Sequence, residues 1–304
     1  MMTADERNFR SSYYEKVGFR NVEEKKSLEI LLKDNPPDCI KLKQFCLRFT
    51  VPGLYRNLLW KLLLNVTPRY MNNLKFVTAQ RTEVYEELVR ALQVMKLINN
   101  DTPKPDLFLL MWLLETGQLK FDLNLQMDDM VFKGFTAISN SLIKIFDDDV
   151  DTYWISKGFY TSVKNFHDCI PKLVEASKTI LEREDKVLFK HLSELGIFDG
   201  SEIAISFNCL FADILHETAL VKIWDKIVGG SFKILPFVAV ILFTTLRRNL
   251  LNITCKSTVF DELKGITEEI SEVIANKAIE LWQQYGSLLV IGDTHKEKIN
   301  ADNS

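Results

Sequence analysis

The sequence has few of the residues that build metal sites and disulfide frameworks. It contains five cysteines and four histidines among 304 residues, and neither a CxxC pair nor an HxxxH pair occurs. Structural zinc sites and disulfide-stabilised folds depend on such clusters. We therefore expect no bound metal and no cofactor. The cysteines are expected to be reduced and mostly buried, as in a cytosolic protein.

The chain also lacks a strong charge imbalance and any long apolar run. Its net charge is -3, and no stripe of lysine and arginine suggests a nucleic-acid partner. The longest mainly apolar run, Ile234 to Leu246, is too short for a membrane span, which needs roughly 20 apolar residues. The N-terminus has no apolar signal region. These features predict a cytoplasmic protein without a transmembrane segment.

Familiar catalytic signatures are absent as well. The sequence contains neither a GxxxxGK[ST] phosphate-binding loop nor a GxSxG nucleophile motif. The carboxylates of Asp147 to Asp151 lack the spacing of an EF-hand loop. We interpret this cluster as a solvated helix junction, because aspartate is favourable near a helix N-terminus.

Helical periodicity dominates what is present, and it predicts one all-α domain. Ile203 to Phe207 has strand propensity, but no alternating run lies nearby to pair with it. The predicted organisation is an N-terminal helical extension over 1–44, a main domain over 45–250, closing helices over 251–293 and a disordered tail over 294–304. Within this scheme we expect Val259 to Ile270 and Val273 to Leu288 to be the last two helices.

One helix start stands out at Pro52. Proline suits the beginning of a helix, because its missing N–H would have no partner there. Arg56 and Trp60 follow at i and i+4, so that the guanidinium can lie against the indole. Far downstream, Trp224 and Asp225 stand in a second apolar helix, which ends at a glycine pair before another apolar run.

These segments together resemble the TBC (Tre-2/Bub2/Cdc16) domain family over roughly residues 45 to 250. The family pattern has Ile-Pro, then Arg-x-x-x-Trp, and later a Trp-Asp step, and Val51 here replaces the isoleucine. The resemblance implies an all-helical, Rab-GAP-like fold. It implies that Arg56 holds helices together, through a buried carboxylate such as Asp225, and does not contact a phosphate. The framework residues are then Pro52, Arg56, Trp60, Trp224 and Asp225.

TBC proteins accelerate GTP hydrolysis with an arginine from Ile-x-x-Asp-x-x-Arg and a glutamine from Tyr-x-Gln. A guanidinium stabilises the charge that builds on the transferred phosphoryl group, and the amide positions the attacking water. This arginine and this glutamine are called the catalytic fingers, and the sequence offers only weak candidates for them. These are Arg90, with Glu87 at the aspartate position, and Gln118, with Thr116 at the tyrosine position. The other interpretation of Arg90 is a solvated helix residue paired with Glu86.

The helix expected from Asp106 to Glu115 is apolar around its whole circumference. Such a helix must be covered on every side. One interpretation is a central core helix. The other is a helix with one exposed face for a partner, in which Phe108, Met111 and Trp112 would be the anchors, since aromatic residues and methionine are enriched at interfaces.

Several segments resemble a TBC subgroup that belongs to the tuberous sclerosis (TSC) complex. The resemblance implies a non-catalytic subunit that binds the hamartin coiled coil and, indirectly, tuberin. It supports GTPase activation on Rheb and restraint of target-of-rapamycin signalling, in the cytoplasm or peripherally on lysosomal or vesicle membranes. An active Rab GTPase-activating protein that uses Arg90 and a helical adaptor without a GTPase link stay open. The segments are Arg7 to Arg10, Tyr13 to Arg20, Val22 to Lys33, Ile223 to Val228 and Phe237 to Val240.

Overall fold

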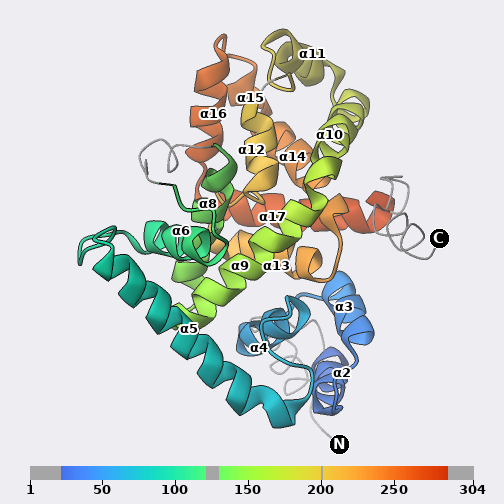
Figure 1. Cartoon of the computed structure of the whole chain (residues 1–304). Helices are drawn as coiled ribbons and strands as arrows, with labels where there is room; N and C mark the ends of the chain where they lie inside the picture. Colours follow the sequence, from blue (N-terminus) through green and yellow to red (C-terminus); the bar gives the residue numbers. More distant parts are fainter. Residues whose placement is uncertain (1–21, 121–129, 200, 287–304) are drawn as a thin grey trace, which may run out of the picture. The chain divides into compact units, whose positions relative to one another are not determined.

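The computed structural model describes residues 22–120, 130–199 and 201–286, and its regular elements there are all helical (Figure 1). No strand occurs among these residues, so the all-α prediction is confirmed. Ile203 to Phe207, which had strand propensity, lies within a helix. No helix in the described ranges combines the length and apolarity that a membrane crossing requires. The predicted tail over 294–304 and residues 1–21 of the predicted N-terminal extension lie outside the described residues.

The chain divides into two compact units. The first unit comprises Met1–Val163 and His216–Ser231, and the second comprises Lys164–Leu215 and Phe232–Ser304. Helix labels follow Figure 1. The first unit holds α2 (Val22–Lys33), α3 (Cys39–Arg48), α4 (Gly53–Leu63), the short η1 (Met71–Asn73), α5 (Leu74–Val94), α6 (Lys104–Glu115), α8 (Met130–Ile145), α9 (Asp149–Phe166) up to Val163, and α13 (Glu217–Val228).

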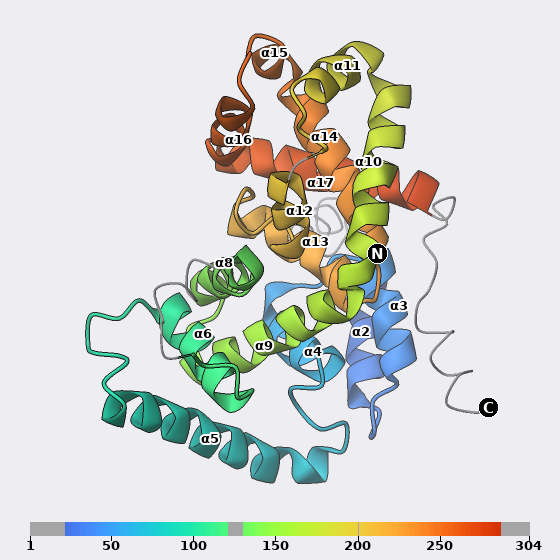
Figure 2. The same cartoon turned by 45° about the horizontal axis from the view of Figure 1, so that its top comes forward.

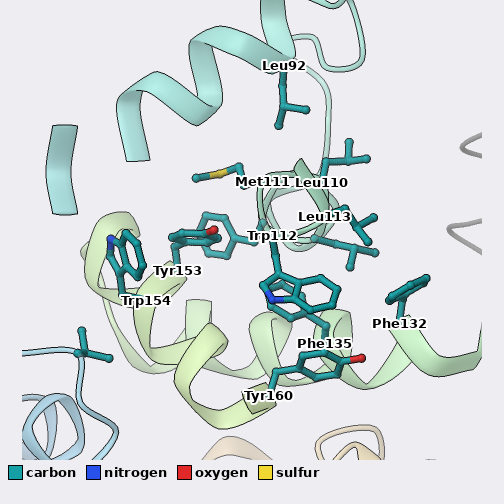
Figure 3. Close-up of a cluster of buried hydrophobic side chains, with 13 residues drawn as sticks. Leu92, Leu110, Met111, Trp112, Leu113, Phe132, Phe135, Tyr153, Trp154 and Tyr160 are labelled. Atoms are coloured by element: carbon teal, nitrogen blue, oxygen red, sulfur yellow. The ribbon is translucent and has the colours of Figure 1, made fainter. Parts of the chain in front are cut away.

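The core of the first unit forms around α6, because this helix has no polar face to turn toward water. It packs on α5 and α8, and Trp112 packs against the rings of Phe135 and Tyr160 at centroid distances of 5.7 and 5.1 Å (Figure 3). Phe108 and Met111 are fully buried, and Trp112 is 4% exposed. The core interpretation therefore holds. The expected exposed face with Phe108, Met111 and Trp112 as partner anchors is wrong, because these side chains fill the interior.

The second unit is built around another fully apolar helix, α14. Pro236 stands in its first turn, where proline is tolerated, and α14 packs on both α10 and α17. His191 adds a polar link, since its Nε2 lies 3.0 Å from the carbonyl oxygens of both Leu250 and Ile253. The helices of this unit are η2 (His167–Cys169), α10 (Ile170–Glu184), α11 (Lys186–Glu194), α12 (Ser201–Asn208), η3 (Phe232–Ile234), α14 (Leu235–Thr245), α15 (Arg247–Leu250), α16 (Lys256–Lys264) and α17 (Glu268–Tyr285).

The predicted last two helices were divided at the wrong place. Val259 to Ile270 is not one helix, because α16 ends before Gly265 and α17 begins after Thr267. The Thr267 hydroxyl caps α17 by accepting a hydrogen bond from the backbone N–H of Ile270 at 3.4 Å. The apolar periodicity continues through residues 265–267, so the prediction based on it did not identify Gly265 and Thr267 as the residues between the two helices.

Candidate functional site

A buried carboxylate, that of Asp225 in α13, organises the first unit. Its Oδ1 accepts hydrogen bonds from Trp60 Nε1 at 2.9 Å and from Arg56 Nε at 3.3 Å. Its Oδ2 accepts from the backbone N–H of Val51 at 3.0 Å and from the terminal guanidinium nitrogen of Arg56 at 3.4 Å. Asp225 is fully buried. A charge in such a place needs both a counter-charge and hydrogen bonds, and here it has both.

The residues identified as framework candidates from the sequence thus meet at one point. Pro52 lies one residue before α4 as defined in the structure, and its carbonyl oxygen accepts from the backbone N–H of Arg56 at 3.1 Å. The Arg56 guanidinium lies 5.9 Å from the Trp60 ring centroid. Trp224 is 6.2 Å from Trp60, and Phe159 contacts both rings. The Nε and Nη2 groups of Arg56 are both engaged in this cluster, so its guanidinium is not available for bidentate binding of a phosphate.

Lys226, the next residue along α13, binds the end of α3, and the sequence analysis did not identify it as a structural residue. It is 1% exposed, and its Nζ donates to the carbonyl oxygens of Cys46 at 2.8 Å and Phe49 at 2.6 Å. A lysine that donates to the last carbonyls of α3 stabilises the end of that helix. The missed signal was a lysine among the buried residues Ile223, Trp224, Ile227 and Val228.

α3 and α13 approach each other closely at Gly229. A Cβ there would meet the Cβ of Cys46 and the side chain of Leu47, each at 3.1 Å. Burial raises the pKa of the Cys46 thiol, which therefore stays protonated and packs as a small apolar group. Asp225, Lys226 and Gly229 together hold α13 against the α3–α4 segment.

The two predicted finger residues belong to different elements, Arg90 to α5 and Gln118 to the turn after α6. Arg90 is exposed on α5, and among the described residues no ion pair joins it to Glu86, so the predicted pair is not formed. Gln118 is exposed, and its backbone N–H donates to the Leu113 carbonyl at 2.9 Å. Thr116, at the tyrosine position, turns its hydroxyl back to the Trp112 carbonyl at 2.8 Å.

A better match to the arginine-finger pattern was missed in the sequence. Ile98 and Asp101 occupy the isoleucine and aspartate positions of Ile-x-x-Asp-x-x-Arg, and Lys104 occupies the arginine position. Lys104 opens α6 directly after this turn. Its Nζ forms an ion pair with Asp149 Oδ1 at 2.8 Å. A lysine presents a compact point charge and lacks the planar fork of arginine.

Two of the aspartates from 147 to 151 bind side chains from α4 and α6. Asp149 pairs with Lys104, and Asp151 accepts from Lys61 at 2.7 Å and from Asn57 at 3.1 Å. Asp149 and Asp151 also stand in the first turn of α9, as the helix-junction interpretation predicts. In the described part of the chain, no group of three or more histidine, cysteine, aspartate or glutamate residues is arranged to hold a metal ion.

The cysteines follow the prediction in their burial. Cys46, Cys169 and Cys209 are buried, Cys39 is half-buried and Cys255 is exposed. All five fall within the described ranges, and each is a free thiol.

This arrangement is that of a TBC Rab-GAP domain. The Ypt/Rab-GAP domain of Gyp1p superposes with a TM-score of 0.56 at 15% identity, covering 87% of this chain and 99% of that one. The Chlamydomonas flagellar RabGAP TBC domain gives a TM-score of 0.55 at 14% identity, covering 90% and 93%. At such identities these structures establish the fold alone.

The chain belongs to the family of TBC1 domain family member 7. It is 39% identical to that protein from Danio rerio over 281 residues, which is 92% of this chain and 96% of the relative. It is equally 39% identical to the Homo sapiens protein over 288 residues, 93% of this chain and 97% of the relative. No protein-family model matches the chain.

Proposed function

We propose that this chain is a non-catalytic TBC-fold subunit that binds the hamartin coiled coil and stabilises the TSC complex. Tuberin would be reached indirectly, through hamartin. In that assembly the chain supports GTPase activation on Rheb and thereby restrains target-of-rapamycin signalling. The protein acts in the cytoplasm, peripherally on lysosomal or vesicle membranes, and it uses no cofactor.

The observation that carries the non-catalytic part is the residue at the arginine-finger position. Lys104 stands there, and its ammonium is held by Asp149 at 2.8 Å. An arginine finger contributes about 10³ to 10⁵ in rate, through a planar guanidinium aimed at the transferred phosphoryl group. A lysine neutralised by a neighbouring carboxylate supplies neither the geometry nor the free charge.

The contrast between the finger region and the framework supports the same proposal. The Asp225 carboxylate keeps four hydrogen bonds, from Val51, Arg56 and Trp60. The expected tyrosine and glutamine of the second finger are represented only by Thr116 and Gln118. The chain has the buried Asp225 network that holds the fold together but lacks the arginine and the tyrosine–glutamine pattern of the two fingers. This combination supports a protein that uses the TBC fold to bind a partner and not to catalyse GTP hydrolysis.

Two measurements test the proposal. The full chain is expected to co-purify with a hamartin coiled-coil fragment, and it is expected to leave single-turnover GTP hydrolysis by Rheb and by a panel of Rab proteins unchanged. Absence of a complex with the coiled coil would overturn the binding part. Trp112 is unsuitable as a binding probe, because its side chain lies in the core of the first unit.

The second candidate is an active Rab GTPase-activating protein that uses Arg90. It is favoured by the exposure of Arg90 on α5 and by the Rab-GAP fold of the structural neighbours. Hydrolysis stimulated by the wild type and abolished in Arg90→Ala, with Lys133→Ala as the exposed control, would establish it. A helical adaptor without a GTPase link would be left if both the coiled-coil and hydrolysis assays were negative.

A further inference from the structure

A cleft opens in the first unit between α3 and the end of α4. Its volume is about 470 Å³, within the range of ligand-binding pockets. Pro37, Leu62 and Leu63 line it from the buried side, and Ile40, Lys43 and Arg69 line it from the exposed side. The helices α2, α3 and α4, drawn in blue, lie together in both views (Figures 1 and 2).

Apolar side chains around this cleft are unusually exposed. Ile40, which lines it, is 72% exposed, and Tyr70, next to the lining Arg69, is 61% exposed. Six of the eleven large exposed hydrophobic residues in the described part of the chain fall between residues 30 and 76. Of these six, Ile40 lines the cleft and Tyr70 adjoins it in the sequence. These six are Ile30, Ile40, Leu54, Tyr70, Met71 and Phe76.

The rim of the cleft carries two positive charges, those of Lys43 and Arg69. Lys43 and Arg69 are exposed, and neither forms an ion pair or side-chain hydrogen bond with a described residue. Asp38 also lines the cleft, but its Oδ1 caps α3 by accepting from the backbone N–H groups of Ile40 at 3.0 Å and Lys41 at 3.2 Å. Hydrogen bonding from Lys41 lowers the Asp38 pKa, so this carboxylate is ionised and engaged. The two free cations remain available for an external anion.

We propose that the cleft is the docking site for an acidic amphipathic helix of a partner protein. An apolar side chain of that helix enters between Ile40 and the Leu62–Leu63 floor, and its carboxylates reach Lys43 and Arg69. An apolar anchor with flanking charged contacts is the ordinary pattern of helix-in-groove recognition. The inference rests on the proposed function, because the helix is then supplied by the hamartin coiled coil.

The decisive experiment reverses the rim charges in the full chain. Binding of a hamartin coiled-coil fragment is measured by titration calorimetry for wild type and for the double variant Lys43→Glu, Arg69→Glu. We expect the Kd to rise at least about tenfold at low salt, since two attractive contacts become repulsive. The matched control is Arg90→Glu, Lys133→Glu, which changes the charge equally at exposed residues outside the cleft lining.

Two further variants separate folding from binding. Lys43→Ala, Arg69→Ala removes the charges without repulsion and should weaken binding less than the reversal does. Ile40→Ser should weaken binding with little change in its salt dependence, because it removes an apolar contact. Circular dichroism and thermal unfolding check that each variant is folded, as expected for exposed positions.

The outcomes distinguish the two proposals. If wild type binds the coiled coil and the rim reversal binds no more weakly than its matched control, the docking site is overturned and the proposed function stands. If wild type does not bind, the proposed function itself fails. Selective weakening by the rim reversal and by Ile40→Ser supports the site.

Discussion

The indole nitrogen of Trp60 donates a 2.9 Å hydrogen bond to the buried carboxylate of Asp225, across 165 positions of sequence. Arg56 lies one helical turn before Trp60 on the same face of α4. Its Nε donates a 3.3 Å hydrogen bond to the same carboxylate oxygen of Asp225. α4 and α13 are thereby fixed to each other within the first unit. Arg56 is therefore a structural counter-ion to Asp225.

Asp225→Asn should destabilise the protein strongly. The substitution leaves the Arg56 guanidinium without its counter-charge and gives the Trp60 indole a weaker acceptor. Breaking one side of a buried pair costs about 3 to 5 kcal/mol. Urea unfolding followed by circular dichroism measures the change. Asp147→Asn, an exposed aspartate in the same unit, is the control and should change stability by less than about 0.5 kcal/mol.

Lys226→Met should loosen the end of α3. The variant keeps the volume of the lysine stem but removes both hydrogen bonds to the carbonyls of Cys46 and Phe49. Leaving buried acceptors unsatisfied costs about 1 to 3 kcal/mol. Hydrogen exchange should accelerate at the last turn of α3 more than in α8. Unchanged protection of α3 would contradict the capping role of Lys226.

Asp213→Asn should stabilise the second unit at neutral pH. Asp213 Oδ1 is buried without a hydrogen-bond partner among the described residues, and Oδ2 accepts from the Ser206 hydroxyl at 3.1 Å. Burial raises the Asp213 pKa above its ordinary value of 3.8, although the Ser206 bond and Lys264 oppose this. The folded state therefore binds the proton more tightly than the unfolded state, and wild type loses stability as pH rises through the folded pKa.

The pH dependence provides the check on Asp213. The stability advantage of Asp213→Asn should be full at pH 7 and should shrink as pH falls, disappearing below the unfolded pKa, where the wild-type carboxyl is neutral too. Urea midpoints between pH 3 and 7 measure it. A difference that stays constant with pH would show that the raised pKa is not the cause.

Cys255 should be the most reactive thiol of the protein. It is exposed immediately before α16, and its Sγ lies 3.1 Å from Ser257 Oγ. Hydrogen bonding from the Ser257 side chain, followed by the backbone N–H groups of Ser257 and Thr258, lowers the pKa of the Cys255 thiol. Because thiolate is the nucleophile, limited iodoacetamide near pH 7 should label this residue first.

Mass spectrometry of the labelled peptides tests the order of reaction. Ser257→Ala should slow alkylation at Cys255 and leave the rate at half-buried Cys39 unchanged. Faster labelling at Cys39 than at Cys255 in the wild type would contradict the prediction.

Local patterns in the sequence predicted most of the helices and part of the candidate site. The fully apolar stretches that became α6 and α14 could only be core helices or partner surfaces, and both are core. The resemblance to the TBC family implied that Arg56 meets a buried carboxylate such as Asp225, and the structure places the two together. The sequence analysis missed the α16–α17 break at Gly265 and the finger match ending at Lys104.

The sequence by itself determined the helical class, the family and the residues able to form a buried polar cluster, because these depend on periodicity and on residue type. Only the tertiary structure decided the roles. It placed Phe108, Met111 and Trp112 inside the core and joined Lys226 to the end of α3. It also left Lys43 and Arg69 beside a cleft without partners among the described residues. Burial and pairing are properties of contacts between distant segments, and no local pattern encodes them.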